Sequence, residues 1–479
     1  MIKYKRKITG LKCIIEGGNL NSVSGLLAII LAAGEGKRMY SKKPKVLHEI
    51  CGMSMVEHVC KSAKEAGAEE IVVVVGHCSE EVQKKLKGVK FAFQETQLGT
   101  GHAVIQADKY IESGPVLVLC GDTPLLSAGT IRKMYEIHKA QNNHATVLTA
   151  DFENPFNYGR IIRDSDENIT AIIEERDADL KQKKIKEINS GIYLFEGNLL
   201  KEALCELNND NDQGEYYLTD VIKSFNTKNL KIGAFKIENS NEIMGVNNRL
   251  QLSEAEALMR KSILEEHMLR GVTITDPGNT YIDCNVKIEK DVTVLPGSII
   301  KGNTYIEEDA QIGPYSKVED SHIGKGVSVQ NSVVLESSIG EGTNIGPFAY
   351  LRPGNVIGKH AKIGDFVEMK NSNFGDNSKA SHLTYIGDGD VGRNVNLGCG
   401  VVFVNYDGKE KHRTIVEDDS FVGCNVNLVA PVKVGKNSYV AAGTTVTDDV
   451  PEASLAVGRA RQENKEGWVK KKGLLKYED

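Results

Sequence analysis

Two patterns of hydrophobic positions divide the chain. In the first half, short apolar runs alternate with segments whose apolar residues recur at helical spacing, which predicts strands over 28–33, 71–75, 116–119, 145–149 and 192–195 and helices over 55–66 and 130–141. This alternation favours a mostly parallel sheet with helices on both faces. Ligands of such sheets bind at the carboxyl ends of the strands.

From residue 272 onward, aliphatic residues recur at every sixth position. Three unbroken runs share this period: Ile282, Ile288, Val294, Ile300, Ile306, Ile312 and Val318; Ile339, Ile345, Leu351, Ile357, Ile363 and Met369; Val416, Val422, Leu428, Val434, Val440 and Val446. Six is not a helical period, so the pattern predicts short strands joined by tight turns, with three repeats to each coil of a β-helix. We expect the register to slip by one residue near 318–323 and 369–374, and the polar stretch 405–413 to leave the ladder as an excursion.

A helical linker is predicted between the two halves, over 252–270. Ser253 and Glu256 have the spacing of a capping box, and Gly271 is a natural C-terminal stop. The expected division is therefore an extension at 1–25, an α/β domain at 26–250, a linker at 251–271 and a β-helix domain at 272–479.

Composition narrows the class of protein. The formal net charge is −6 over 479 residues, too acidic for a general nucleic-acid binder. Nine cysteines are scattered without a C-x-x-C pair, which fits reduced thiols in a cytoplasmic protein better than a disulfide framework or a zinc site. The longest apolar run, 26–33, is too short to span a bilayer, and the basic start lacks the features of a secretory signal.

Two segments of the first half carry candidate chemistry. Gly34 and Gly36 follow a predicted strand, and with Arg38 and Lys45 nearby they suit an anion such as phosphate. The spacing is neither a P-loop nor a dinucleotide-binding fingerprint. Asp122 ends another predicted strand, where a carboxylate can hold Mg²⁺ between phosphate oxygens or merely cap a turn.

These motifs together resemble the sugar-1-phosphate nucleotidyltransferases. The resemblance rests on L-A-A-G-E-G-K-R-M (31–39), P-K-V-L-H (44–48) and Q-E-T-Q-L-G-T-G-H-A (94–103), followed by Y-G-R (158–160), I-N-S-G (188–191), E-Y-Y-L-T-D (215–220) and G-V-N-N-R (245–249). With the hexapeptide half attached, it covers about 26–470. The pattern is similar to the bifunctional family that joins an N-acetylglucosamine-1-phosphate uridyltransferase to a glucosamine-1-phosphate N-acetyltransferase.

The resemblance implies roles for residues of the first half. Contacts with the uridine nucleotide fall to Leu31, Ala32, Gly34, Gln94, Gly99 and Thr100, phosphate neutralisation to Arg38 and Lys45, sugar binding to Gly159, Glu174, Asn189 and Asn247, and Mg²⁺ to Asp122 and Asn247. Cys120 stands where relatives often carry tyrosine. His48 and His102 are expected to make structural hydrogen bonds, because transfer of a uridylyl group needs no histidine base.

The β-helix half carries a second set of candidates. Arg352 and Lys370 are eighteen positions apart, three repeats, so they stack in adjacent coils. A phosphate between them would offset their repulsion, although a solvated cationic face is the usual meaning of such a pair. Ala380 and Ile386 occupy inward positions, so His382 points outward and can take a proton from an attacking amine.

The resemblance extends these assignments. It implies that His382 is the base, that glucosamine 1-phosphate contacts Arg352, Lys370, Tyr385 and Asn396, and that acetyl-CoA contacts Cys399, Asn405, Tyr406, Cys424, Ala442 and Arg459. Cysteines 399 and 424 replace the alanine and serine of some relatives. A left-handed β-helix and a homotrimer with acetyltransferase sites between subunits are also implied.

The expected function is the two-step synthesis of UDP-N-acetylglucosamine from glucosamine 1-phosphate, acetyl-CoA and UTP, for peptidoglycan and lipopolysaccharide precursors. A first alternative is a one-activity nucleotidyltransferase whose β-helix only assembles or regulates. A second is a degenerate nucleotide-binding module on a scaffold. The two residue sets, one around Asp122 and one around His382, argue against both alternatives.

Overall fold

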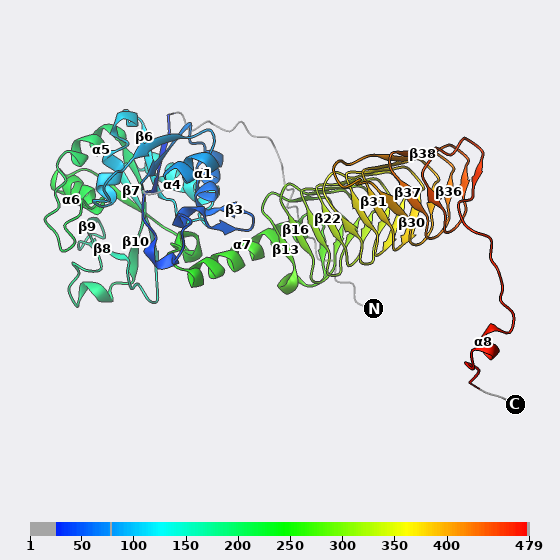
Figure 1. Ribbon diagram of the computed structural model, residues 1–479. Helices are drawn as coiled ribbons and strands as arrows, with labels where there is room; N and C mark the ends of the chain where they lie inside the picture. The colour runs from blue at the N-terminus through cyan, green and yellow to red at the C-terminus, as the bar shows by residue number, and fades with distance from the viewer. Residues whose placement is uncertain (1–24, 77–78, 477–479) are drawn as a thin grey trace, which may run out of the picture. The chain divides into compact units, whose positions relative to one another are not determined.

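The structure is a computed structural model that describes residues 25–76 and 79–476 (Figure 1). The expected extension at 1–25 therefore lies outside the described residues, except for Gly25. Contacts divide the chain into two compact units between Ala255 and Glu256, within the predicted linker.

The first unit is built on a nine-stranded sheet in the order β11-β7-β10-β6-β1-β4-β5, with β8 paired to β10 and β9 to β8. The strands are β1 (Leu27–Ala32), β4 (Glu70–Val75), β5 (Lys90–Phe93), β6 (Pro115–Cys120), β7 (Ala145–Asp151), β8 (Gly159–Arg163), β9 (Ile169–Ile173), β10 (Glu187–Glu196) and β11 (Ile232–Lys236), with a separate hairpin of β2 (Glu49–Ile50) and β3 (Met53–Ser54). Strand β1 pairs in parallel with β4 and β6, so the five predicted strands form one sheet.

Strand β10 departs from the prediction in length and direction. It runs antiparallel to β6 and β7 and begins at Glu187 rather than Ile192. Its register shifts between Asn189 and Tyr193, where Gly191 has φ +77°. The polar sequence of this bulge hides the first half of the strand from an apolar pattern.

Helices cover both faces of the sheet (Figure 1). They are α1 (Met55–Glu65), α2 (Ser79–Lys85), α3 (Thr100–Ile105), α4 (Ala128–Ala140), α5 (Gly197–Leu204) and α6 (Thr219–Thr227), with 3-10 turns at Lys37–Met39, Lys45–Leu47, Asp108–Tyr110, Gln182–Lys184 and Ser240–Ile243. In β1, Ala28 and Ile30 pack in the cluster with α1 and α4, whereas Leu27 and Ile29 pack in the cluster with α3, α5 and α6. This alternation confirms a Rossmann-like unit buried on both faces.

The linker helix α7 spans Arg249–Leu269, so the predicted capping box is wrong. The side chain of Asn248 accepts from the backbone N–H of Gln251 at 2.9 Å and caps the helix a turn earlier, which leaves Ser253 inside it. The predicted stop is confirmed, because Gly271 follows the helix with φ +96°.

The second unit is a parallel β-helix of three sheets, each using every third strand up to β40, after which β41 pairs with β39 in the first sheet. The first sheet contains β12 (Thr273–Ile274), β15 (Thr293–Val294), β18 (Gln311–Ile312), β21 (Ser328–Val329), β24 (Asn344–Ile345), β27 (Lys362–Asp365), β30 (Lys379–His382), β33 (Asn396–Leu397), β36 (Phe421–Val422), β39 (Tyr439–Val440) and β41 (Leu455–Ala456). The second contains β13 (Tyr281–Ile282), β16 (Ile299–Lys301), β19 (Lys317–Glu319), β22 (Val333–Leu335), β25 (Tyr350–Leu351), β28 (Glu368–Lys370), β31 (Tyr385–Gly387), β34 (Val402–Val404), β37 (Asn427–Val429) and β40 (Thr445–Val446).

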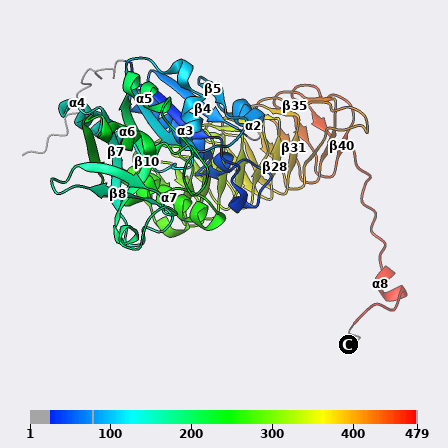
Figure 2. The ribbon, with the colours of Figure 1, turned by 90° about the vertical axis from the view of Figure 1, so that its left-hand side faces the viewer.

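The third sheet contains β14 (Lys287–Ile288), β17 (Tyr305–Ile306), β20 (His322–Ile323), β23 (Ser338–Ile339), β26 (Val356–Ile357), β29 (Asn373–Phe374), β32 (Gly389–Val391), β35 (Thr414–Val416) and β38 (Val432–Val434). Figure 2 shows β28 and β31 in successive coils of the stack. A 3-10 turn at Pro277–Asn279 and a short helix α8 (Trp468–Lys471) complete the unit.

The hexapeptide pattern marks the core of this unit. All nineteen aliphatic residues of the three predicted runs are buried, except Ile288, which is half-buried. This confirms the predicted fold class, a Rossmann-like α/β sheet followed by a hexapeptide-repeat parallel β-helix.

The predicted register slips are confirmed, and three more occur. Buried residues are five positions apart at the expected places, and also between 329 and 334, 334 and 339, and 386 and 391. These shorter corners contain Asn331, Glu336 and Asp388 with φ of 43°, 40° and 50°, conformations that tighten the turn. The excursion is confirmed as a loop between β34 and β35. Among the described residues, no helix is both long and apolar enough to cross a bilayer.

Candidate active sites

The first candidate site lies where β1 and β6 end. The backbone N–H of Gly121 donates to the carbonyl of Leu31 at 2.9 Å, which holds the two strand ends together. Gly36 has φ +65°, and a Cβ there would lie 2.5 Å from the Cβ of Lys45. Glycine is required at this position because the loop passes directly over Lys45.

Four predicted residues converge at this edge. The Nζ of Lys45 lies 2.5 Å from Asp122 Oδ2 and 3.1 Å from Asn247 Oδ1. Arg38 Nη2 donates to the same amide oxygen at 3.1 Å. Asn247 reaches the strand ends because the N–H of Val246 donates to the carbonyl of Asp122 at 2.9 Å.

This donor set fits a hard divalent cation. Asp122 and Asn247 each direct an oxygen atom at the same place, where both oxygens contact the Lys45 ammonium group. In the described part of the chain, no group of three or more His, Cys, Asp or Glu residues could hold a metal ion. A cation here would therefore take its remaining ligands from water and substrate phosphates, as Mg²⁺ commonly does.

A cavity of about 270 Å³ opens beside these groups. Its lining includes eight of the predicted residues, namely Leu31, Ala32, Gly34, Lys45, Gln94, Gly99, Thr100 and Asp122. Gln94 donates to the carbonyl of Gly99 at 3.1 Å, which steadies that loop. Cys120 also lines the cavity, and burial raises the pKa of its thiol to about 12, so this thiol stays protonated at neutral pH.

Three of the four predicted sugar-binding residues form a second group, whereas the fourth, Asn247, lies in the first group beside Lys45. Gly159 pairs with Asn189 across β8 and β10. A Cβ on Gly159 would lie 3.5 Å from Glu174 Oε2 and from the Asn189 Cβ, so the three residues lie close together. Burial raises the pKa of Glu174, whose other oxygen accepts from Thr219 at 3.4 Å.

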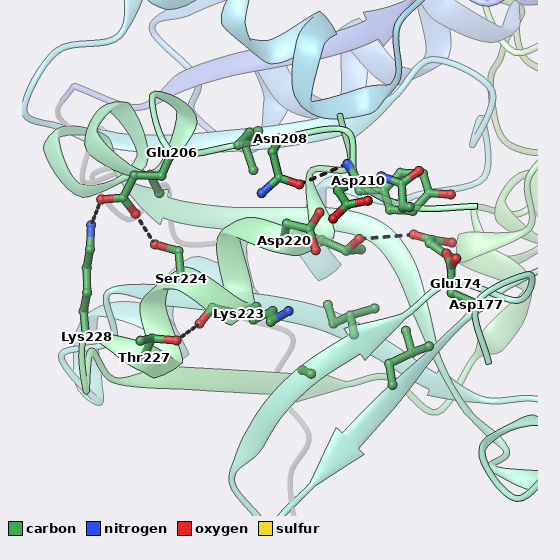
Figure 3. Close-up of a pocket in the computed structure, with 18 residues that line it drawn as sticks. Glu174, Asp177, Glu206, Asn208, Asp210, Asp220, Lys223, Ser224, Thr227 and Lys228 are labelled. Atoms are coloured by element: carbon green, nitrogen blue, oxygen red, sulfur yellow. Dashed lines mark hydrogen bonds and ion pairs between the residues drawn. The ribbon is translucent and has the colours of Figure 1, made fainter. Parts of the chain in front are cut away.

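A larger cavity of about 670 Å³ adjoins Glu174 between β9 and α6 (Figure 3). Figure 3 shows Glu206 bonded to Ser224 and Lys228 at the far end, at 2.7 Å each. Sequence reasoning did not single out this cavity. Thr219 and Asp220 of the segment E-Y-Y-L-T-D (215–220) line it, but the spacing of that segment gave no sign of a cavity.

The two predicted histidines of the first unit make hydrogen bonds. His102 is 3.1 Å from Gln94 through Nδ1 and 3.1 Å from Gln106 through Nε2. His48 Nδ1 lies 3.3 Å from Arg249. These contacts fit the structural role expected for both rings.

The second candidate site lies on the second sheet of the β-helix. Leu351 and Met369 are register partners, which places Arg352 directly beside Lys370 in the next coil. Glu368 accepts from Arg352 Nη1 at 3.1 Å and offsets part of the positive charge. Gly387 follows Lys370 in the column, and a Cβ there would lie 2.5 Å from the Tyr385 hydroxyl oxygen and 2.8 Å from Asn405 Nδ2.

Two charged residues that sequence reasoning missed complete this site. Lys411, from the excursion loop, is the main cause of a lowered pKa of Lys370, followed by burial and by Arg352. Asp388 is buried and accepts from Asn405 Nδ2 at 2.6 Å, so it orients that amide. The spacing of sequence repeats gave no signal for Lys411, because the loop returns outside the hexapeptide register.

His382 points outward as predicted, with its side chain 58% exposed. Its Nδ1 lies 2.6 Å from Asp365 Oδ1, and the two residues are register partners in β30 and β27. The hydrogen bond to His382 lowers the pKa of Asp365. Asp365 was missed, although it lies one coil before His382 and so had a signal in the repeat spacing.

Four predicted residues form a column at one corner of the β-helix. His382, Cys399, Cys424 and Ala442 each follow a buried residue of the first sheet, at 380, 397, 422 and 440, by two positions. Arg459 Nη1 donates to the carbonyl of Ala442 at 2.6 Å and so lies at the end of this column. We call this row of residues the corner groove, a name for their matching places in successive coils.

Asn396, a predicted sugar contact, and Tyr406, a predicted acetyl-CoA contact, also lie outside the corner groove. Asn396 lies on the outward side of β33, beside Lys379 in the preceding coil. Tyr406 is 56% exposed, and its hydroxyl group donates to the carbonyl of Gly408 at 2.7 Å within the excursion loop.

Comparisons with known proteins match segments of both units. Residues 28–186 match the MobA-like NTP transferase domain, residues 278–372 the GMPPB C-terminal domain, and residues 413–448 six repeats of the bacterial transferase hexapeptide. A solved structure of UDP-glucose pyrophosphorylase complexed with UDP-glucose covers 49% of this chain and 98% of its own, with 17% identity and a TM-score of 0.42.

Several relatives match nearly the whole chain, and each is described as bifunctional protein GlmU. The relative from Acetivibrio thermocellus is 57% identical over 95% of this chain and 99% of its own length. Those from Alkaliphilus metalliredigens and Clostridioides difficile are 53% and 52% identical, over 94% and 93% of this chain and 99% and 97% of their own. Identity above one half across both units establishes that the chain belongs to the bifunctional GlmU family.

Proposed function

We propose that this chain makes UDP-N-acetylglucosamine in two steps. The β-helix unit acetylates glucosamine 1-phosphate with acetyl-CoA, and the α/β unit then transfers UMP from UTP to the product. The observation that carries this proposal is the presence of two separate cation-rich sites on one chain, around Lys45 and around Lys370.

In uridyl transfer, a phosphate oxygen of N-acetylglucosamine 1-phosphate attacks the α-phosphorus of UTP, and pyrophosphate leaves. Arg38 and Lys45 neutralise the phosphates, and the cavity residues position the nucleotide. Gly159, Glu174 and Asn189 hold the sugar. Asp122 and Asn247 would hold Mg²⁺, which supplies charge neutralisation between phosphate oxygens when bound.

In acetyl transfer, the amine of glucosamine 1-phosphate attacks the acetyl carbonyl carbon, and the thiolate of CoA leaves. His382 takes the proton lost by the amine at Nε2, while Asp365 accepts from Nδ1 and fixes the ring. Arg352, Lys370 and Lys411 bind the sugar phosphate, and Tyr385 and Asn396 contact the sugar. Acetyl-CoA lies along the corner groove, with Asn405, Tyr406 and Arg459 as further contacts.

Exposed apolar side chains support a homotrimer formed through the β-helix. Tyr315, Phe348, Phe366 and Leu383 are 68%, 56%, 58% and 61% exposed, and each follows a first-sheet inward position by three residues. Such a row of apolar side chains is unusual on the surface of a monomeric protein, and it suits contact with a second copy of this chain. Sedimentation should give three times the chain mass, and Phe366→Glu should yield monomers. We also propose a cytoplasmic location, where acetyl-CoA and UTP are available.

A coupled assay tests the function. Glucosamine 1-phosphate, acetyl-CoA and UTP together should yield CoA, pyrophosphate and UDP-N-acetylglucosamine. Without UTP the product should stop at N-acetylglucosamine 1-phosphate, and without acetyl-CoA no UDP-N-acetylglucosamine should form. Pyrophosphate release from UTP and glucose 1-phosphate, together with no acetyl transfer, would instead favour a one-activity nucleotidyltransferase.

A further inference from the structure

Two cysteines are neighbours in the corner groove. Cys399 and Cys424 each lie two positions after Leu397 and Val422, which are register partners. The backbone N–H of Asn425 donates to the carbonyl of Cys399 at 2.8 Å. The two cysteines therefore occupy matching places in consecutive coils.

The backbones approach closely at this corner. A Cβ on Gly398 would lie 2.7 Å from the nitrogen and 3.0 Å from the Cα of Cys424, so no side chain separates the coils there. Neighbouring strands lie about 4.8 Å apart. That spacing falls inside the Cα separation of about 4.4–6.8 Å that a disulfide bridges.

Both thiols are free, and solvent reaches them. Cys424 is exposed and Cys399 is half-buried. Disulfides in cytosolic proteins are mostly transient and serve catalysis or redox sensing.

We propose that Cys399 and Cys424 form a modification site. The two thiols exchange with a low-molecular-weight disulfide, and the disulfide we propose is CoA disulfide. The choice of CoA disulfide rests on the proposed function, because the corner groove is the path assigned to acetyl-CoA. The shape and contacts that hold acetyl-CoA would also deliver the disulfide of CoA to these sulfurs.

The exchange occurs in two balanced steps. One cysteine thiolate attacks a sulfur of CoA disulfide, which forms a protein–CoA mixed disulfide and releases one CoA as a thiolate, which takes up a proton. The second cysteine thiolate attacks the protein sulfur of that bond and expels the second CoA as a thiolate, which takes up a proton. Two protein thiols are oxidised, and one CoA disulfide is reduced to two CoA molecules.

The bridge should switch off one activity only. It ties together two side chains that line the groove beside His382, so acetyl-CoA can no longer lie along it. The uridyl transfer site belongs to the other unit and contains neither cysteine. A reducing thiol should reverse the effect.

Peptide mapping tests the bridge directly. The reduced full-length enzyme is incubated with CoA disulfide, freed of excess reagent, alkylated under denaturing conditions and digested with trypsin. Cleavage after Lys409, Lys411 and Arg413 separates the two cysteines, so a bridge appears as one cross-linked peptide pair that dithiothreitol resolves. Acetyl transfer should fall about tenfold or more, the equivalent of losing about 1.4 kcal/mol of binding free energy, and recover with dithiothreitol.

Variants identify the pair. Cys424→Ser should trap the mixed CoA disulfide on Cys399 and form no bridge. The matched control Cys205→Ser, at an exposed cysteine of the other unit, should still form the bridge and still lose acetyl transfer. In the double variant Cys399→Ala/Cys424→Ser, the acetyl transfer rate should be the same before and after treatment, whatever its absolute value.

Three outcomes would overturn the inference: a mixed disulfide without a bridge in the natural sequence, a bridge that leaves acetyl transfer unchanged, or equal rates with glutathione disulfide, which the groove has no reason to bind. Its failure is distinct from failure of the proposed function. If the reduced enzyme does not acetylate glucosamine 1-phosphate, the function itself is wrong. If it does so and no bridge forms, only the dithiol inference is wrong.

Discussion

The pair formed by His382 and Asp365 allows a strict test of acetyl transfer. His382→Ala removes the proposed base, and Asp365→Asn removes the charge that faces its Nδ1 while keeping the shape. Because a positioned general base contributes about 10²–10⁴-fold, His382→Ala should lower kcat by that amount.

The structure explains why Asp365→Asn should lower kcat less than His382→Ala does. The contact is short, at 2.6 Å, but the two side chains are 58% and 37% exposed, so water competes for both partners. We therefore expect about a tenfold loss in kcat, at the low end of the range for groups that orient another residue. The asparagine amide can still accept from Nδ1, which keeps part of the orientation.

A double-variant cycle decides whether Asp365 acts through His382. If it does, the double variant should be no slower than His382→Ala alone, because Asp365 has nothing left to orient. CoA release measures acetyl transfer, and pyrophosphate release from the same preparations should be unchanged. Additive losses, or an effect of Asp365→Asn on KM alone, would refute the reasoning.

Asp122→Asn should lower the rate of uridyl transfer by about 10²-fold or more and leave acetyl transfer intact. Asn247→Ala should also lower uridyl transfer. Retained Mg²⁺-dependent pyrophosphate release in both variants would contradict the metal assignment. Lys411→Met should raise KM for glucosamine 1-phosphate about tenfold with little change in kcat. Since Lys411 lowers the pKa of Lys370, phosphate binding should weaken at a lower pH than an ordinary lysine implies, and Lys411→Met should move this alkaline limb upward in a KM–pH profile. Ile363→Ala, at a fully buried position, should lower the free energy of unfolding by about 2–5 kcal/mol in a denaturant titration; a loss below about 0.5 kcal/mol would contradict its place in the core.

The amino-acid sequence by itself determined the architecture of both units. Inward positions such as Ile300 and Val422 repeat at a fixed spacing because each coil must bury one aliphatic residue per side. This requirement acts within each repeat, so the sequence of the repeat shows it. The same holds for the strand ends at Leu31 and Asp122, whose motifs combine a buried run with a following loop. The outward direction of His382 also followed from its neighbours in the repeat.

Only the tertiary structure decided which side chains meet. Asn247 reaches Asp122 through a backbone hydrogen bond between segments more than one hundred residues apart, and Lys411 reaches Lys370 from a loop outside the repeat. The start of α7 depended on Asn248, a cap that competes with Ser253 for the same helix. Periodicity records what each residue does with respect to its own strand or helix, whereas these contacts arise from the packing of distant segments, which no local pattern encodes.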